Sequence, residues 1–231
     1  MRTVRFGLIV IAALVLAFVS LGRVGAQSTL SQGPANPGTA TDDNSAGGNA
    51  WSNTSNALVL DGSLATSLII VGSPSTDLLA LTNFGLTVPA GSTIVGVTVN
   101  VTLDVTPTNC AADNIVRLCT GVGAMTGSNQ ARPNTTGWQT SLNTVTYGSS
   151  SSTWGATLTP AIVNSAGFGF EIQAAGMSGC NSTITPAVDG ATMTITYTPP
   201  PPAGTRRIFI MTQTGRPSSA GVDAVRSRMG L

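Results

Sequence analysis

Apolar residues recur at every second position through long stretches of the chain, and this spacing constrains the fold more than any other feature. Between Val95 and Val105 the apolar positions alternate with Gly, Thr, Asn and Asp, and residues 168–174 and 190–198 repeat the pattern. Successive side chains of a β-strand point to opposite faces, so such a segment packs one face on a core and leaves the other in water. The sequence therefore predicts half-buried antiparallel strands.

Shorter apolar runs separated by turn residues predict five further strands, at residues 57–60, 67–71, 78–84, 114–119 and 153–158. Asp61-Gly62 and the serine run 149–152 are typical turn sequences. Thr159 before Pro160 predicts one short helical turn with Thr159 as its N-cap. About eight to ten strands at this spacing predict an all-β fold, an antiparallel, jelly-roll-like β-sandwich.

The ends of the chain differ in composition from this alternating region. Residues 1–26 carry Arg2 and Arg5 before an apolar run and small residues before Gln27, which predicts a signal peptide cleaved after Ala26. The alternative is a retained membrane anchor. Residues 27–50 are rich in Gly, Pro, Ser, Asn and Thr and predict a loosely packed, low-complexity lead-in. The sandwich is then expected over residues 51–198, outside the cell or on its surface, without membrane contact after cleavage.

Several segments of the region 33–198 look familiar as a set. The segments WSNTSNALVLDGSLAT, LTNFGLTVPAGSTIVGVTVNV, NIVRLCTGVGAMTGSNQA, WGATLTPAIVNSAGFGFEIQA and AVDGATMTITYT together resemble a jelly-roll-like β-sandwich module of secreted bacterial and phage-associated structural proteins. The resemblance implies a structural role and no defined activity, cofactor or ligand.

Two residue types that serve many functions are missing from the chain. Histidine is absent and all ten basic residues are arginines, so the commonest acid/base group and any Lys–Asn crosslink are excluded. No G-x-S-x-G motif accompanies the many serines, and Glu171 is the only glutamate. We therefore expect a protein that is not an enzyme and binds no cofactor.

Three cysteines remain in a chain expected to reach an oxidising compartment. Cys110 and Cys180 each lie in a loop beside a predicted strand, so a Cys110–Cys180 disulfide is expected if the two loops share one end of the sandwich. Cys119 lies within a predicted strand and is left over, either as a small buried residue or as an intermolecular partner. No C-x-x-C spacing supports zinc.

Two sets of side chains suggest a ligand, and each has a plainer interpretation. Trp51, Trp138 and Trp154 could stack on the sugar rings of a surface glycan, or they could pack in the core. The oxygens of Asn56, Asp61 and Asp189 could hold Ca²⁺, or they could bond their own turns. Without a D-x-D-x-D loop the second interpretation of these acids is favoured, and no metal is predicted.

The C-terminal residues 199–231 contain a proline spacer and one more apolar run. Pro199 to Pro202 in polyproline II geometry would extend about 12 Å. A strand is expected over residues 206–212, with the assembly residues Arg206, Arg207, Ile208, Phe209, Ile210 and Met211. This strand is apolar on both faces and needs cover on both. It could add to the sheet of a second copy, which would make a homo-oligomer, fold back on its own sandwich, or remain disordered.

The charges of the chain also separate by region. Residues 27–198 hold eight acids against Arg117 and Arg132, a net charge of −6, whereas residues 199–231 hold five arginines against Asp223, a net charge of +4. A second copy is thus a more natural partner for the tail than nucleic acid. We expect a secreted, non-enzymatic structural or cell-surface subunit that assembles through its tail. The alternative is a monomeric carbohydrate-binding or adhesive module.

Overall fold

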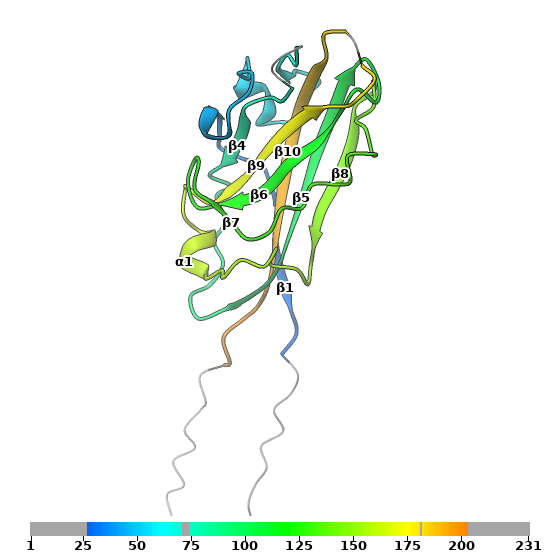
Figure 1. Cartoon of the computed structure of the whole chain (residues 1–231). Helices are drawn as coiled ribbons and strands as arrows, with labels where there is room; N and C mark the ends of the chain where they lie inside the picture. The colour runs from blue at the N-terminus through cyan, green and yellow to red at the C-terminus, as the bar shows by residue number, and fades with distance from the viewer. Residues whose placement is uncertain (1–26, 71–73, 181, 203–231) are drawn as a thin grey trace, which may run out of the picture. The chain divides into compact units, whose positions relative to one another are not determined.

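The computed structural model describes residues 27–70, 74–180 and 182–202, and the signal peptide and the assembly strand predicted for residues 1–26 and 206–212 lie outside them. The described chain forms two five-stranded antiparallel sheets, which we call sheet A and sheet B (Figure 1). From β4 onward the chain crosses repeatedly from one sheet to the other, as in a jelly roll. The predicted all-β sandwich is confirmed.

Sheet A contains the two longest strands. Its order is β1 (Leu30–Ala35), β10 (Thr185–Thr198), β5 (Thr93–Thr106) and β8 (Asn143–Ser149), and the short β3 (Ala65–Thr66) pairs with the first part of β10. The apolar positions of β5 and β10 point into the sandwich, and Val97, Val99 and Ile195 are fully buried. Their threonines lie on the other face, as the period of two predicts.

In sheet B the central strands β4 and β9 are buried on both faces, unlike the half-exposed strands that the alternation predicts. Its order is β2 (Thr39–Asp43), β4 (Leu78–Thr82), β9 (Gly169–Gly176), β6 (Ala111–Cys119) and β7 (Met125–Thr126). Phe170 and Ile172 of β9 face the core, while Glu171 and Gln173 on its other face are also buried. Two loops cover that outer face, since Gly123 N donates to Glu171 Oε1 and Gln173 Nε2 donates to Gly47 O.

The prediction of a loosely packed lead-in over residues 27–50 is wrong for most of that segment. Strand β1 pairs with β10, and β2 pairs with β4, so the segment supplies an edge strand to each sheet. Its composition hid these strands because an edge strand needs only one neighbour and buries few side chains. The β1 side chains are indeed mostly exposed, and Leu30 is 49% exposed.

Other strand predictions had mixed outcomes. Strands β4 and β6 confirm the runs 78–84 and 114–119, and α1 (Pro160–Val163) begins after the N-cap Thr159, whose hydroxyl accepts from Ile162 N. Residues 57–60 form no strand, because Ala57 ends a 3₁₀ turn (Thr54–Ala57) and only Leu58 forms a single bridge, to Gly190. Residues 153–158 form no strand either, because the chain bends at Trp154, with φ of 57°. Of the run 67–71, Ile69 forms a single bridge to Ile184. Strand β8 was not anticipated.

The register of the strands in sheet A defines the two ends of the sandwich. At one end, which we call the exit end, Leu30 lies opposite Tyr197 and Thr198 lies opposite Thr93, so β1 starts where β10 finishes. At the other end, which we call the disulfide end, Thr185 lies opposite Thr106. Figure 1 shows the start of β10 at the top of the view and its finish at the bottom.

Candidate functional site

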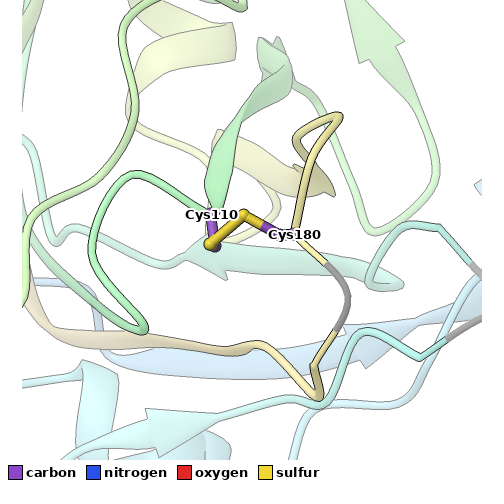
Figure 2. Close-up of a disulfide and its surroundings, with 2 residues drawn as sticks. All are labelled: Cys110 and Cys180. Atoms are coloured by element: carbon purple, nitrogen blue, oxygen red, sulfur yellow. A yellow bond between two sulfur atoms is a disulfide. The ribbon is translucent and has the colours of Figure 1, made fainter.

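The loops at the disulfide end are held by the predicted disulfide. Cys110 precedes β6 and Cys180 follows β9, and Figure 2 shows their sulfur atoms bonded. The two Cα atoms are 5.8 Å apart. Met177 N also donates to Cys110 O at 2.8 Å. The expected Cys110–Cys180 pairing is therefore confirmed, and it ties together two loops that lie 70 residues apart in the sequence.

Beside this disulfide lies a small hollow between the ends of the two sheets. Its volume is about 170 Å³, and Ile69, Ile70, Pro74, Gly176, Met177, Cys180, Ser182 and Ile184 line it. Ile69 and Ile184 belong to the sheet A side, where they exchange backbone hydrogen bonds of 2.8 and 3.1 Å. Pro74 and Gly176 belong to the sheet B side, where Gly176 N donates to Pro74 O at 2.7 Å. We call this feature the disulfide-end hollow.

Two large apolar side chains stand in water next to the hollow. Leu68 is 52% exposed and Ile70 is 49% exposed, whereas Ile69 between them is buried. This alternation places Leu68 and Ile70 on the outer side of an edge segment that pairs with the chain entering β10. Among the described residues, Leu68 makes no backbone–backbone hydrogen bond. Exposed apolar side chains along a sheet edge are typical of an interaction surface.

Sheet A has a second uncovered edge at β8. In the described part of the chain β8 pairs only with β5. The exposed side chains of β8 are polar, those of Asn143, Thr144, Thr146 and Ser149. Hydroxyl and amide groups gain nothing from leaving water beside an apolar strand, so β8 offers backbone pairing without apolar burial.

The three tryptophans are in the core, which contradicts their assignment as glycan contacts. Trp51, Trp138 and Trp154 are 5%, 2% and 1% exposed. Each indole nitrogen already donates inside the protein: Trp51 to Asp77 O at 2.8 Å, Trp154 to Val97 O at 2.9 Å, and Trp138 to Asp113 Oδ1 at 2.7 Å. A sugar ring cannot stack on a buried indole, so the alternative of core packing is correct.

The buried carboxylate of Asp113 is the centre of a polar cluster. It accepts from Arg132 N at 3.0 Å, from Arg132 Nε at 2.8 Å and from Nη2 at 3.1 Å, and from Tyr147 OH at 3.0 Å besides Trp138. Burial alone would raise the pKa of Asp113, but the hydrogen bonds from Arg132 and Trp138 outweigh it and lower the pKa. Because Asp113 belongs to β6 and Tyr147 to β8, the cluster joins the two sheets.

A second buried polar cluster lies under the loop that covers sheet B. Glu171 is fully buried, its Oε1 accepts from Gly123 N at 2.7 Å, and its Oε2 has no hydrogen-bond partner among the described atoms. Burial raises the pKa of Glu171. Cys119 is buried beside it as the free thiol, and burial together with the Glu171 charge raises the pKa of Cys119. No cysteine partner in a second copy could reach this thiol while the fold is intact.

The candidate Ca²⁺ ligands bond backbone groups of the protein, but only Asp61 bonds its own turn, and Asp189 lies within β10 rather than in the expected turn. Asp189 Oδ1 accepts from Asp61 N at 3.1 Å and from Gly62 N at 3.0 Å, Asp61 Oδ1 accepts from Ser63 N at 2.8 Å, and Asn56 Nδ2 donates to Leu64 O at 3.0 Å. Within residues 27–70, 74–180 and 182–202, no group of three or more Cys, Asp or Glu side chains could hold a metal ion.

The same part of the chain contains no helix that is long and apolar enough to cross a membrane.

Sequence reasoning found the disulfide but not the disulfide-end hollow. The signal for Leu68 and Ile70 was present in residues 68–70, LII, where an apolar residue at every position leaves one face to be covered by something else. The assembly residues Arg206 to Met211 lie outside the described chain. No protein-family model, curated protein or solved structure matches this chain, so the resemblance to a jelly-roll-like module of secreted structural proteins stays a prediction.

Proposed function

We propose that this protein is an exported, non-enzymatic structural subunit that assembles head-to-tail through its C-terminal strand. The observation that carries the proposal is the placement of complementary features at opposite ends of one sandwich. The chain leaves β10 at the exit end toward an apolar segment, and exposed apolar side chains, Leu68 and Ile70, stand at the disulfide end. A contact between unlike surfaces of two copies repeats into a ring or a filament.

Charge and chemistry support the same proposal. The described body carries a net charge of −6 and the tail a net charge of +4, so tail and body of different copies attract each other. The disulfide is compatible with an oxidising compartment outside the cytosol. The buried carboxylate of Asp113 is used inside the fold, where it accepts five hydrogen bonds.

The alternative of a monomeric carbohydrate-binding or adhesive module has less support. It relied on Trp51, Trp138 and Trp154 as stacking platforms, and all three are buried. A glycan would have to be held without these indole rings, by polar side chains of the surface. We therefore propose assembly as the principal function.

The proposal is tested by removing the apolar character of the tail in the full chain. The variant carries Ile208→Ser, Phe209→Ser, Ile210→Ser and Met211→Ser. These changes keep the length of the tail and all of its arginines. We expect sedimentation velocity and electron microscopy to show assemblies for the parent protein and single particles for the variant. A second variant serves as the control. It carries Val222→Ser and Val225→Ser, keeps residues 208–211 unchanged, and should assemble. Equal assembly by the four-residue variant would overturn the proposal.

A further inference from the structure

Ile70, which lines the disulfide-end hollow, and Leu68 in the same segment are not buried in the described part of the sandwich. Ile69 and Ile184 complete the core at this end, but the two side chains beside Ile69 remain about half exposed. The hollow opens between the two sheets, and its surface is divided about equally between polar and apolar atoms, with Ile70, Pro74 and Met177 among the residues that line it. Its volume of about 170 Å³ compares with the roughly 150 Å³ of an apolar cavity that accommodates a benzene ring.

We propose that the disulfide-end hollow receives Phe209 of a second copy, with the Ile208–Met211 segment lying along Leu68 and Ile70. This inference rests on the proposed function and adds the receiving surface and the residue that fills it. In a strand that is apolar on both faces, the side chains of one face can fill the hollow, and those of the other face can cover the edge segment that contains Leu68 and Ile70. Burial of Leu68 and Ile70 then removes the largest exposed apolar side chains of this end from water.

The length of the chain favours a second copy over the same copy. Strand β10 has 14 residues, so Thr198 and the hollow are separated by about 45 Å at 3.3 Å per residue. Between Thr198 and Phe209 the chain can span only about 37 Å, counting the four prolines at 3.1 Å and the rest at 3.5 Å per residue. Moreover β10 runs toward the exit end, so its own tail starts in the wrong direction and would need a turn to come back. A second copy placed ahead of the exit end meets no such limit.

The disulfide-end hollow is also better suited to this occupant than the edge of β8. The exposed side chains of β8 are polar, whereas those beside the hollow are Leu68 and Ile70. An apolar strand therefore gains more hydrophobic stabilisation beside Leu68 and Ile70 than along the polar side chains of β8. The Cys110–Cys180 disulfide lines the hollow through Cys180 and holds one of its walls, so the surface is preformed rather than built on binding.

The test compares full-length variants of the receiving surface with a matched control. Leu68→Asp with Ile70→Asp places charges on the surface, and Ser182→Trp fills the mouth of the hollow from an exposed position. Leu142→Asp is the control, since Leu142 is 45% exposed and stands just before β8. We expect the first two variants to weaken assembly by about tenfold or more in dissociation constant and the control to leave it unchanged. Circular dichroism and the unfolding midpoint establish that each variant is folded.

A cross-linking experiment locates the contact directly. One full-length variant carries Leu68→Cys and a second carries Ile210→Cys; the two are mixed and oxidised, and the disulfide is mapped by mass spectrometry. We expect a heterodimer joining residues 68 and 210, and none when Leu142→Cys replaces Leu68→Cys.

The outcomes separate this inference from the proposed function. If the tail variant with four serines loses assembly while the Leu68 and Ile70 variant and the Ser182 variant assemble like the parent, the tail assembles elsewhere and the receiving site is overturned. If Leu142→Asp blocks assembly instead, the edge of β8 is the receiver. If the tail variant still assembles, both proposals fall.

Discussion

Leu30 lies directly opposite Tyr197 in the ladder between β1 and β10, so the described chain begins and finishes at the same end of the sandwich. The opposite end carries the disulfide and the exposed pair Leu68 and Ile70. The C-terminal tail therefore starts about one full strand length from the surface that is proposed to receive the tail of another copy. This separation is what makes a repeating contact geometrically simple.

Loss of the Cys110–Cys180 disulfide should lower the stability of the fold. The bond closes a loop between residues 70 positions apart, and it constrains the unfolded chain. We expect Cys110→Ser with Cys180→Ser to reduce the free energy of unfolding by about 2–4 kcal/mol, measured by urea denaturation. The parent protein unfolded in the presence of reductant should match the double variant. An unchanged midpoint would show that the bond does not form in the protein.

Cys119 should be unreactive in the folded protein. Its thiol is fully buried in β6, and burial raises its pKa, so the thiolate that reacts with maleimide is scarce and inaccessible. We expect no labelling under native, non-reducing conditions and one label per chain in guanidinium chloride, counted by mass spectrometry. Rapid native labelling, or a dimer linked through Cys119, would contradict the burial described here.

Asp113→Ala should be one of the most destabilising substitutions in the chain. It removes the common acceptor of Arg132, Trp138 and Tyr147 and leaves these donors without their partner. We expect a loss of about 3–5 kcal/mol in the free energy of unfolding. Asp104→Ala is the matched control on β5, for which a change within about 0.5 kcal/mol is expected. Similar losses of unfolding free energy in both variants would mean that the Asp113 cluster stabilises the fold no more than an ordinary surface carboxylate does.

The same cluster predicts a loss of stability in acid. The pKa of Asp113 is lowered in the folded protein, so its contribution is present above the unfolded value of about 3.9 and is lost as the pH falls through the folded pKa. Urea denaturation between pH 5 and pH 2 should show a steeper decline for the parent than for Asp113→Asn. Parallel declines would assign the acid sensitivity to other groups.

Glu171 should have the opposite pH dependence. Burial raises its pKa above the unfolded value of about 4.3, so ionisation above that value costs the folded state more than the unfolded state. Glu171→Gln keeps an acceptor for Gly123 N and removes the charge. We expect the stability of this variant relative to the parent to be greater at pH 7.5 than at pH 4.5, again by urea denaturation. A difference that does not change with pH would refute the burial of a titrating carboxyl.

The buried tryptophans predict a spectroscopic result that bears on glycan binding. Since Trp51, Trp138 and Trp154 are at most 5% exposed, iodide should quench their fluorescence weakly in the folded protein and strongly after unfolding. Added oligosaccharides should leave the emission spectrum unchanged. Strong quenching in the native state would place at least one indole at the surface and would revive the carbohydrate-binding alternative.

Periodicity alone identified the strands in which one face packs on the core and the other face meets water. The alternation through Val97 and Val99 predicted β5, the threonine-spaced run to Tyr197 predicted β10, and Thr159 with Pro160 predicted the start of α1. The disulfide followed from the position of Cys110 and Cys180 beside strand ends. In each case the interaction that decides the structure is local, or it depends only on which strand ends meet.

Tertiary structure decided the features that depend on neighbours distant in the sequence. Residues 30–43 became two strands because β10 and β4 offered free edges, although their own composition indicated a loop. The tryptophans went to the core because partners such as Asp113 could satisfy their indole nitrogens there. The covering loop buried Glu171 on a face expected to meet water. A residue's own sequence window contains none of these partners, so the sequence determined the strands and the fold class, and packing determined which side chains remain at the surface to meet another molecule.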